Sequence, residues 1–255
     1  MFYHDTAFAV PDLEAKIWRF MSLAELVSLL SKQALFFSRA DKLDDPFEGS
    51  LPKLAVAQAE EGFDRLTPRG RELIRTTRQQ HGYLQSKLWT MVNCWYVNDH
   101  ESAAMWKLHA SDGVAIQSTF RRFVDAVAHS KLEIRVGLVR YLDYETESWD
   151  VAQDPRTIVS IIHKRKSFKH EHELRAVIAE PIPGGIYSLA EGPGYLSPAG
   201  LPGIYVEVDL TQLVEKIHVS PGSPPWFQDV VRTIAGIAKL DGTVIQSKLD
   251  DDPLW

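Results

Sequence analysis

The chain has 255 residues, of which 45% are hydrophobic and 24% charged, and its formal net charge is −6 at pH 7. This composition is typical of a soluble globular protein with a sizeable core. The acidic balance argues against a surface coated for non-specific nucleic-acid binding, although a local basic patch is compatible with it. Cys94 is the only cysteine, which excludes an intrachain disulfide and a cysteine-based zinc cluster.

The N-terminal segment Met1–Val10 has neither the basic region nor the apolar stretch of a signal peptide. No apolar run along the chain approaches the length of a membrane span. We therefore expect a cytoplasmic protein that does not enter a membrane.

Apolar segments and turn residues alternate along the first half of the chain. Ser22 and Glu25 have the spacing of a capping box, which predicts that a helix begins after Ser22. Strands are expected at Ile17–Phe20, Leu35–Ser38, Trp89–Tyr96 and Gly113–Ser118. Further helices are expected from Val56 to Leu88 with a break at Thr67–Pro68, at Ser102–Ala110 and at Phe120–His129.

The second half continues the alternation. Asp154 and Pro155 predict the start of a helix that reaches about Lys166. Another helix is expected at Pro224–Ala238, and strands at Glu133–Tyr141, Leu174–Ala179, Gly203–Val208, Lys216–Val219 and Thr243–Ser247. The Gly- and Pro-rich stretch 181–202 predicts a long surface loop, and residues 250–255 a loose tail. We expect a single α+β domain over residues 1–255, with its core at about 17–247 and peripheral helices on a mixed, twisted sheet.

The run from Lys164 to Arg175 contains nine ionisable side chains. If a strand includes Glu171, Glu173 and Arg175, these three side chains alternate onto one face. Two neighbouring carboxylates push one pKa upward, as general acid–base chemistry requires. The alternative is a structural ion-pair network with Lys164, Lys166 or Lys169, and the residues leave both interpretations open.

Arg19 lies between Trp18 and Phe20 and has the geometry to clamp a phosphate or a carboxylate. It is equally suited to pair with Glu173 or Asp45 and order the core. The segment Asp44–Glu48 is typical of a turn, and its three carboxylates also suit a divalent cation.

Trp106 and His109 share one face of their predicted helix. Trp106 is suited to stack on a ring and His109 to transfer a proton, while aromatic packing with a satisfied histidine is the alternative. His163, His170 and His172 do not have the spacing of a zinc-binding pair on a helix. The chain also lacks the glycine-rich and nucleophile-elbow motifs of dinucleotide-binding, P-loop and α/β-hydrolase proteins.

Several segments, in this order, resemble a bacterial and phage family, the domain-of-unknown-function family twenty-nine seventy-one. They are Ser38–Glu48, Met105–Ala110 with Gly113–Ile116, Val139–Tyr144 and Lys166–Arg175. The resemblance covers about Trp18 to Ser247. His109 departs from it, because a tyrosine is expected there in many members. The family carries no established reaction, so the resemblance predicts boundaries rather than chemistry.

A weaker resemblance is to the ADP-ribosyltransferase fold, through Trp18–Phe20, Phe36–Ser38 and Glu171–Glu173. Enzymes of that fold use an Arg or His on the first strand to hold NAD and a Ser or aromatic residue from a middle strand. A Glu at the start of a later strand, often as Glu-x-Glu, completes the site. The resemblance implies that Glu173 supports the transition state and Glu171 positions or activates the acceptor. It implies that NAD, consumed as a substrate, is bound by Arg19, Ser38, Trp106 and Arg175.

We therefore predict an NAD-consuming ADP-ribosyltransferase-like enzyme, with a toxin or a phage-conflict protein as its biological setting. Its partners are a small-molecule nucleotide and a protein or nucleic-acid acceptor. Two alternatives stay open. One is a metal-dependent nuclease or phosphodiesterase that uses Asp45, Glu48, Glu171 and Glu173, with Lys166 near the phosphate. The other is a non-catalytic interaction module in which the charged run is purely structural.

Overall fold

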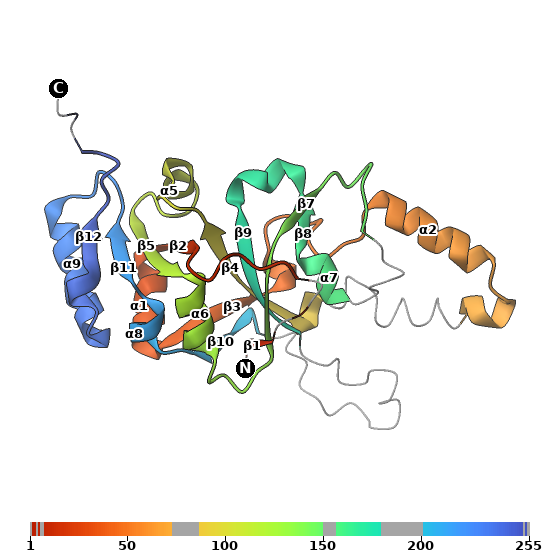
Figure 1. Ribbon diagram of the computed structural model, residues 1–255, viewed down its shortest axis with the longest axis horizontal. Helices are drawn as coiled ribbons and strands as arrows, with labels where there is room; N and C mark the ends of the chain where they lie inside the picture. Colours follow the sequence, from red (N-terminus) through yellow and green to blue (C-terminus); the bar gives the residue numbers. More distant parts are fainter. Residues whose placement is uncertain are drawn as a thin grey trace.

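The computed structural model describes residues 2–3, 5, 8–72, 87–149, 157–179, 201–251 and 253. Its body is elongated, with α9 (Pro225–Ala235) at one end and α2 (Lys53–Asp64) projecting from the other (Figure 1). A large twisted sheet runs through the middle of the molecule, and the remaining helices pack around it. The prediction of an α+β architecture with a mixed sheet and peripheral helices is confirmed.

The described part of the chain forms a sheet of ten strands and a separate two-stranded sheet of β7 (Arg140–Leu142) and β8 (His163–Arg165). The main path of the larger sheet runs in the order β1 (Phe2–Tyr3), β6 (Ile134–Leu138), β9 (Glu173–Ala179), β4 (Thr90–Val97), β2 (Lys16–Ser22), β5 (Gly113–Thr119), β11 (Lys216–Val219) and β12 (Val244–Gln246). β3 (Ala34–Arg39) pairs with β4 and with β10 (Gly203–Glu207) as a branch. β1 is parallel to β6 and β11 to β12, and the other pairs are antiparallel, so the sheet is mixed. The three strands that matter for the site, β9, β4 and β2, are adjacent although they are far apart in the sequence.

The other elements are short. The helices are α1 (Leu23–Lys32), α5 (Ala103–His109), α6 (Phe120–Val127), α7 (Thr157–Ile161) and α8 (Leu210–Leu213). The 3-10 turns are η1 (Ala40–Lys42), η2 (Lys87–Trp89), η3 (Lys166–Glu171), η5 (Gly236–Ala238) and η6 (Asp241–Thr243). The predicted capping box is confirmed, because the Ser22 side chain accepts from the Glu25 backbone N–H and the Glu25 side chain accepts from the Ser22 backbone N–H.

The two faces of the sheet differ in how they are filled. The first face carries α1, α6, α8 and α9 over one continuous apolar cluster, which includes Leu30, Trp95, Phe123, Leu174 and Val231. The second face carries two separate clusters. An aromatic cluster of Trp18, Tyr96, Met105, Trp106, Ala110 and Ala115 lies beneath α5, and an aliphatic cluster that includes Val92, Ile161 and Val177 lies beside α7. Alternation along β4 and β9 sends Cys94, Glu173 and Arg175 to this second face, between the two clusters.

Several sequence-based boundaries are wrong. The helix expected to reach Lys166 ends at Ile161, because His163–Arg165 forms β8 and pairs with β7 (Arg140–Leu142). The strand expected at Glu133–Tyr141 is divided at Val139, whose backbone N–H donates to Glu173 while the next residue's donates to Ile162. These backbone bonds depend on long-range pairing, which local pattern does not report.

Other expectations fall partly outside the described residues. These are the helix start at Asp154 and Pro155, the segment 73–86 and nearly all of the loop 181–202. Of the tail, residues 250, 251 and 253 are described. Among the helices that the structure describes, none is long and apolar enough to cross a membrane.

Candidate functional site

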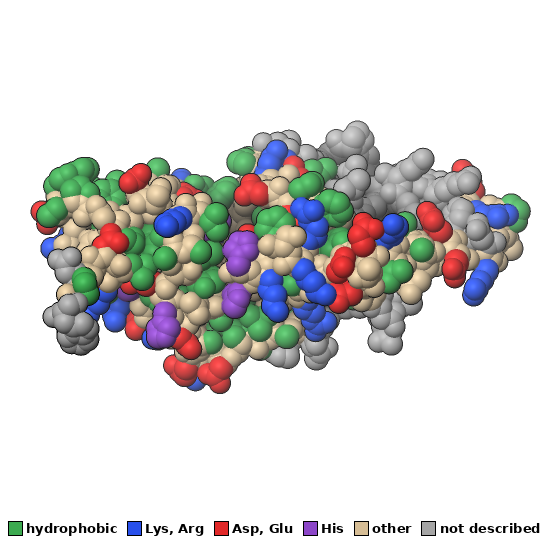
Figure 2. Space-filling view, turned by 90° about the horizontal axis from the view of Figure 1, so that it is seen from above, with side chains coloured by type: hydrophobic (Ala, Val, Ile, Leu, Met, Phe, Trp, Pro, Cys, Tyr) green, Lys and Arg blue, Asp and Glu red, His purple; other side chains and the backbone are tan. Residues whose placement is uncertain are grey.

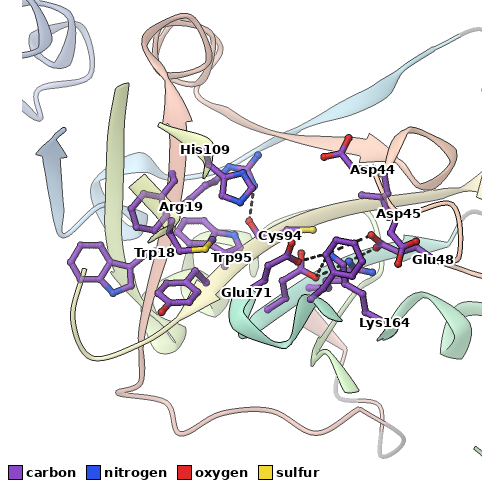
Figure 3. A pocket seen from close by; sticks show the side chains of 17 residues that line it. Trp18, Arg19, Asp44, Asp45, Glu48, Cys94, Trp95, His109, Lys164 and Glu171 are labelled. Atoms are coloured by element: carbon purple, nitrogen blue, oxygen red, sulfur yellow. Dashed lines mark hydrogen bonds and ion pairs between the residues drawn. The ribbon is translucent and has the colours of Figure 1, made fainter. Parts of the chain in front are cut away.

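A cavity of about 260 Å³ opens on the second face, between the aromatic and aliphatic clusters. Its walls come from β2, the turn 43–48, β4, α5, β8, η3 and β9. Figure 3 shows Trp18 and Arg19 on one side and Asp45, Glu48 and Lys164 on the other. Glu171 lies between the two groups. Arg19, Glu171, Glu173 and Arg175 all line this cavity, so four of the six predicted site residues are brought together.

Arg19 occupies the point at which two strands separate. β2 pairs with β4 only at Ile17–Val97 and Trp18–Tyr96. Beyond that point the Arg19 Nη1 donates to the backbone carbonyl of Cys94 at 2.8 Å, in place of a ladder hydrogen bond. The prediction that Arg19 pairs with Glu173 or Asp45 is wrong: within the described residues the structure gives its guanidinium no carboxylate partner. Burial lowers the pKa of Arg19, and the nearby charges of Cys94 and Glu25 offset part of that effect.

Arg175 and Lys164 connect three carboxylates beneath the cavity. Arg175 is fully buried, contacts Glu48, and bonds Glu173 with Nη2 to Oε2 at 2.7 Å. Its Nη1 also donates to the Ile161 carbonyl at 2.6 Å. Lys164 contacts Glu171 and lies 3.4 Å from a carboxylate oxygen of Glu48 and of Glu173. Three carboxylates therefore share two cations, which leaves one negative charge in excess if all of them ionise.

The two glutamates respond to this excess in opposite directions. Burial raises the pKa of Glu171, and the nearby charge of Glu173 adds to the rise despite the Lys164 bond. Burial also acts to raise the pKa of Glu173, but the charges of Arg175 and Lys164 outweigh it and lower that pKa. Two carboxyl groups with divergent pKa values are the arrangement that separates a proton-accepting role from a charge-stabilising one.

The backbone around Glu173 differs from the predicted strand. Glu173 is the first residue of β9, whereas Glu171 ends η3 and His172 between them is left-handed, with φ 38°. The prediction that Glu171, Glu173 and Arg175 alternate along one strand is therefore wrong. Glu171 reaches the cavity from a 3-10 turn, because the left-handed residue turns the chain just before the strand begins.

Four further side chains lie near the two glutamates: Glu48 and Lys164, which the sequence named only for the metal-dependent and ion-pair alternatives, and Cys94 and Tyr141, which it did not assign to a site. Glu48 and Lys164 complete the ion pairs, and the Cys94 thiol bonds Glu173 and lines the cavity. The Tyr141 hydroxyl accepts from the backbone N–H of Glu173 at 2.9 Å. Burial raises the pKa of Cys94, so the thiol stays protonated.

Gly49 allows the turn that carries Glu48 to close. Its φ is +72°, and a Cβ built there would lie 2.8 Å from the Ile161 Cδ1. The Glu48 backbone N–H donates to the Asp45 carbonyl, and the Asp45 carboxylate receives two bonds from Arg165 at 3.0 and 2.8 Å. The turn chemistry predicted for Asp44–Glu48 is confirmed, and the turn also delivers Glu48 into the ion-pair network.

Two predicted cofactor-binding residues lie away from the cavity. Ser38 is on β3, opposite Val92 and Gly203, and is not among the described residues that line it. Trp106 is only 2% exposed, and its Nε1 donates to Glu101 at 3.0 Å. Its ring packs edge-on against Phe20, as the packing interpretation expects, and it is not among the described residues that line the cavity. The aromatic wall of the cavity is made instead by Trp18, Phe20, Trp95 and Tyr96.

The remaining candidates divide between surface and core. His109 is exposed and lines the cavity mouth. Lys166 is on the surface, 2.7 Å from Glu147, and does not line the cavity. His163 is buried against Trp149, and its Nδ1 donates to the Val159 carbonyl. Across the described ranges, no group of three or more His, Cys, Asp or Glu side chains is arranged to hold a metal ion.

Comparison of the chain with protein-family models, with curated proteins and with solved structures found no match. Neither resemblance noted from the sequence is confirmed by them. The functional argument therefore depends on the cavity itself.

Proposed function

We propose that the cavity binds NAD and cleaves its nicotinamide–ribose bond, in the manner of an ADP-ribosyltransferase. The observation that carries the proposal is the meeting of Arg19, Glu171 and Glu173 in one cavity, from adjacent parts of one sheet. The resemblance to that fold requires an arginine on an early strand and a glutamate at the start of a later one. Arg19 on β2 and Glu173 at the first position of β9 satisfy that requirement, with β4 between them.

The cavity is suited to one end of NAD. Its volume of about 260 Å³ lies just below the range typical of small-molecule pockets, which suits a ring with its ribose and leaves the rest of the dinucleotide at the mouth. Trp18, Phe20 and Tyr96 offer aromatic surface to the nicotinamide ring. Arg19 forms no ion pair within the described residues, although the Glu25 charge acts on it, and it is the side chain we assign to a phosphate.

Each glutamate then has a separate task. When the bond between C1′ and the nicotinamide nitrogen breaks, its electron pair leaves with nicotinamide and positive charge develops on the ribose. The ionised Glu173 stabilises that charge. Glu171, with its raised pKa, accepts the proton of the water or acceptor group that forms the new bond to C1′. Arg175 acts through Glu173, by holding its carboxylate ionised and in position.

The metal-dependent alternative is not favoured by the contacts. Asp45 is bonded to Arg165, and the carboxylates of Glu48, Glu171 and Glu173 are held by Lys164 and Arg175. A divalent cation would have to displace these cations before it gained oxygen ligands. The competing interpretation that does have support is a purely structural ion-pair network, because each of these contacts pairs a buried charge without any ligand.

Nicotinamide release from NAD by the purified protein separates the two interpretations. We expect release by the wild type and a loss of about 10²–10³-fold in Glu173→Gln, with the far-UV circular dichroism unchanged. Glu147→Gln, which removes an exposed ion pair with Lys166, is the matched control and should keep full activity. Full activity in Glu173→Gln contradicts the proposal, as does no release by the wild type with cell extract added as a source of acceptors.

A further inference from the structure

Two exposed segments border the mouth of the cavity. His109 ends α5 on one side. On the other side η3 and the residue after it present Lys169, His170 and His172 to solvent, with Phe168 half-buried between the mouth and the interior. Figure 2 views this side of the molecule and shows histidine side chains beside a group of lysine and arginine side chains. The mouth is therefore locally basic in a chain whose net charge is −6.

The positive charge of Lys169 at the mouth is not neutralised by an ion pair with a neighbouring carboxylate. Lys166, at the start of η3, is paired with Glu147. By contrast, the described contacts give Lys169, His170 and His172 no ion-pair partner, and the same holds for His109. These side chains are free to bind an anionic ligand, and several of them together suit a ligand with more than one phosphate.

Phe168 adds an aromatic surface between this surface group and the ion-paired Lys164 and Arg165. Its ring lines the cavity, with the Lys164 Nζ 4.7 Å and the Arg165 guanidinium carbon 5.5 Å from its centre. The Tyr96 ring lies 6.1 Å from the His172 ring and also lines the cavity. Aromatic rings interleaved with cations are the arrangement that stacks bases and tracks the phosphates of a single strand.

We propose that the mouth formed by His109, Phe168, Lys169, His170 and His172 binds single-stranded nucleic acid. The phosphates contact Lys169 and the histidines, and one base stacks on Phe168. A duplex is disfavoured, because a base inside the stack cannot reach a recessed cavity without being flipped out. An acidic protein would use the charge but not the aromatic ring at the entrance.

The role of that strand as the acceptor rests on the proposed function. A lone-pair oxygen or nitrogen of the nucleic acid forms a bond to ribose C1′ as the bond from C1′ to nicotinamide breaks. The electron pair of the broken bond leaves with nicotinamide, and the acceptor's proton passes to Glu171. Binding of the strand itself depends only on the mouth.

Fluorescence anisotropy with labelled oligonucleotides of about 15 nucleotides, one RNA and one DNA, tests the binding. We expect the wild type to bind one or both more tightly than the same sequence in a duplex. Lys169→Glu should weaken binding about tenfold and reduce the slope of log Kd against log salt by about 0.7. Phe168→Leu, which keeps an apolar cover over Lys164, should weaken it about fivefold.

Controls assign the effect to the mouth. Lys131→Glu reverses an exposed lysine in the turn after α6 and should leave the Kd within about twofold. Equal weakening by Lys131→Glu and Lys169→Glu overturns the proposal, and so does polyglutamate that competes as well as unlabelled oligonucleotide. No binding of either oligonucleotide at low salt also overturns it.

The NAD assay is scored separately from the binding assay. Glu173→Gln should bind the oligonucleotide like the wild type while it fails to release nicotinamide. If the wild type binds the oligonucleotide but releases no nicotinamide, the mouth is upheld as a nucleic-acid site and the proposed function is overturned. Nicotinamide release without oligonucleotide binding upholds the function and overturns this inference.

Discussion

The two faces of the sheet are packed by different interactions, apolar contacts on the first and buried ion pairs on the second. On the first face, apolar side chains such as Leu30 and Phe123 form one uninterrupted cluster under four helices. On the second face, a network of buried charges separates the aromatic cluster from the aliphatic one. Apolar burial stabilises wherever surface is removed from water, whereas buried charges do so only when each has its partner. The two faces should therefore respond differently to the loss of one side chain.

The largest difference in unfolding behaviour between the two faces should come from removing Arg175 from the ion-pair network. Arg175→Met leaves Glu48 and Glu173 buried without their fully buried partner, and should cost about 3–5 kcal/mol in urea unfolding. Phe123→Ala on the first face should also cost about 3–5 kcal/mol, because it leaves a cavity in the apolar cluster. The two variants differ in whether a second substitution can restore stability. Adding Glu48→Gln to Arg175→Met removes one unpaired charge and should restore part of the lost free energy of unfolding.

That repair has a clear control. Glu48→Gln added to Phe123→Ala should restore nothing, since the two residues lie on opposite faces. If the changes in the free energy of unfolding of Arg175→Met and Glu48→Gln simply add in the double variant, the two side chains are not coupled. That result would contradict the ion-pair network.

A somewhat smaller loss of folding stability should appear on acidification, and it comes from His163 on the second face. Burial lowers the pKa of His163 to about 4, so the unfolded chain binds a proton on this residue before the folded protein does. The stability that His163 contributes is present above the unfolded pKa of about 6.5 and is lost as pH falls through about 4, by about 3 kcal/mol.

His163→Phe keeps a ring against Trp149 and removes the titrating group. Urea unfolding from about pH 7 down to about pH 4 should show the wild type losing its advantage over the variant. A difference between the two proteins that does not change with pH would mean that His163 has the same pKa in the folded protein and in the unfolded chain.

The smallest expected effect comes from Glu171 and has the opposite sign. Its raised pKa means that the folded protein keeps a proton on this carboxyl when the unfolded chain has lost it. Its contribution is present below the unfolded pKa and is lost as pH rises through the folded pKa. Glu171→Gln should therefore gain stability relative to the wild type as pH rises, measured by the same unfolding series. A gain on acidification instead would place Glu171 with Glu173, whose pKa is lowered.

Much of the fold could be predicted because local pattern specifies it. The capping box at Ser22 and Glu25 defined the start of α1, and apolar runs located β2, β4, β5 and β9 within one or two residues. The division at Val139 could not be predicted, since it depends on bonds to Ile162 and Glu173.

The candidate site was accessible from sequence only in part. Arg19 was found as a charge between two aromatic residues, and Glu171 and Glu173 as members of a dense charged run that leads into an apolar strand; both signals are local. Ser38 and Trp106 were misplaced because their elements are correct but their positions relative to the cavity are set by tertiary packing. Glu48 and Lys164 became partners of Glu173 only through the contact between a turn, β8 and β9.

The central claim is that the cavity on the second face binds NAD. Calorimetric titration of NAD into Glu173→Gln tests that claim without turnover. The account predicts one NAD bound per chain. Adding Arg19→Met should weaken binding about tenfold or more, because the phosphate loses its cation. Adding Arg121→Met, an exposed arginine paired with Glu14, should leave the affinity unchanged. No heat from NAD, or equal affinity with and without Arg19, would contradict the account and leave the charged face a structural network.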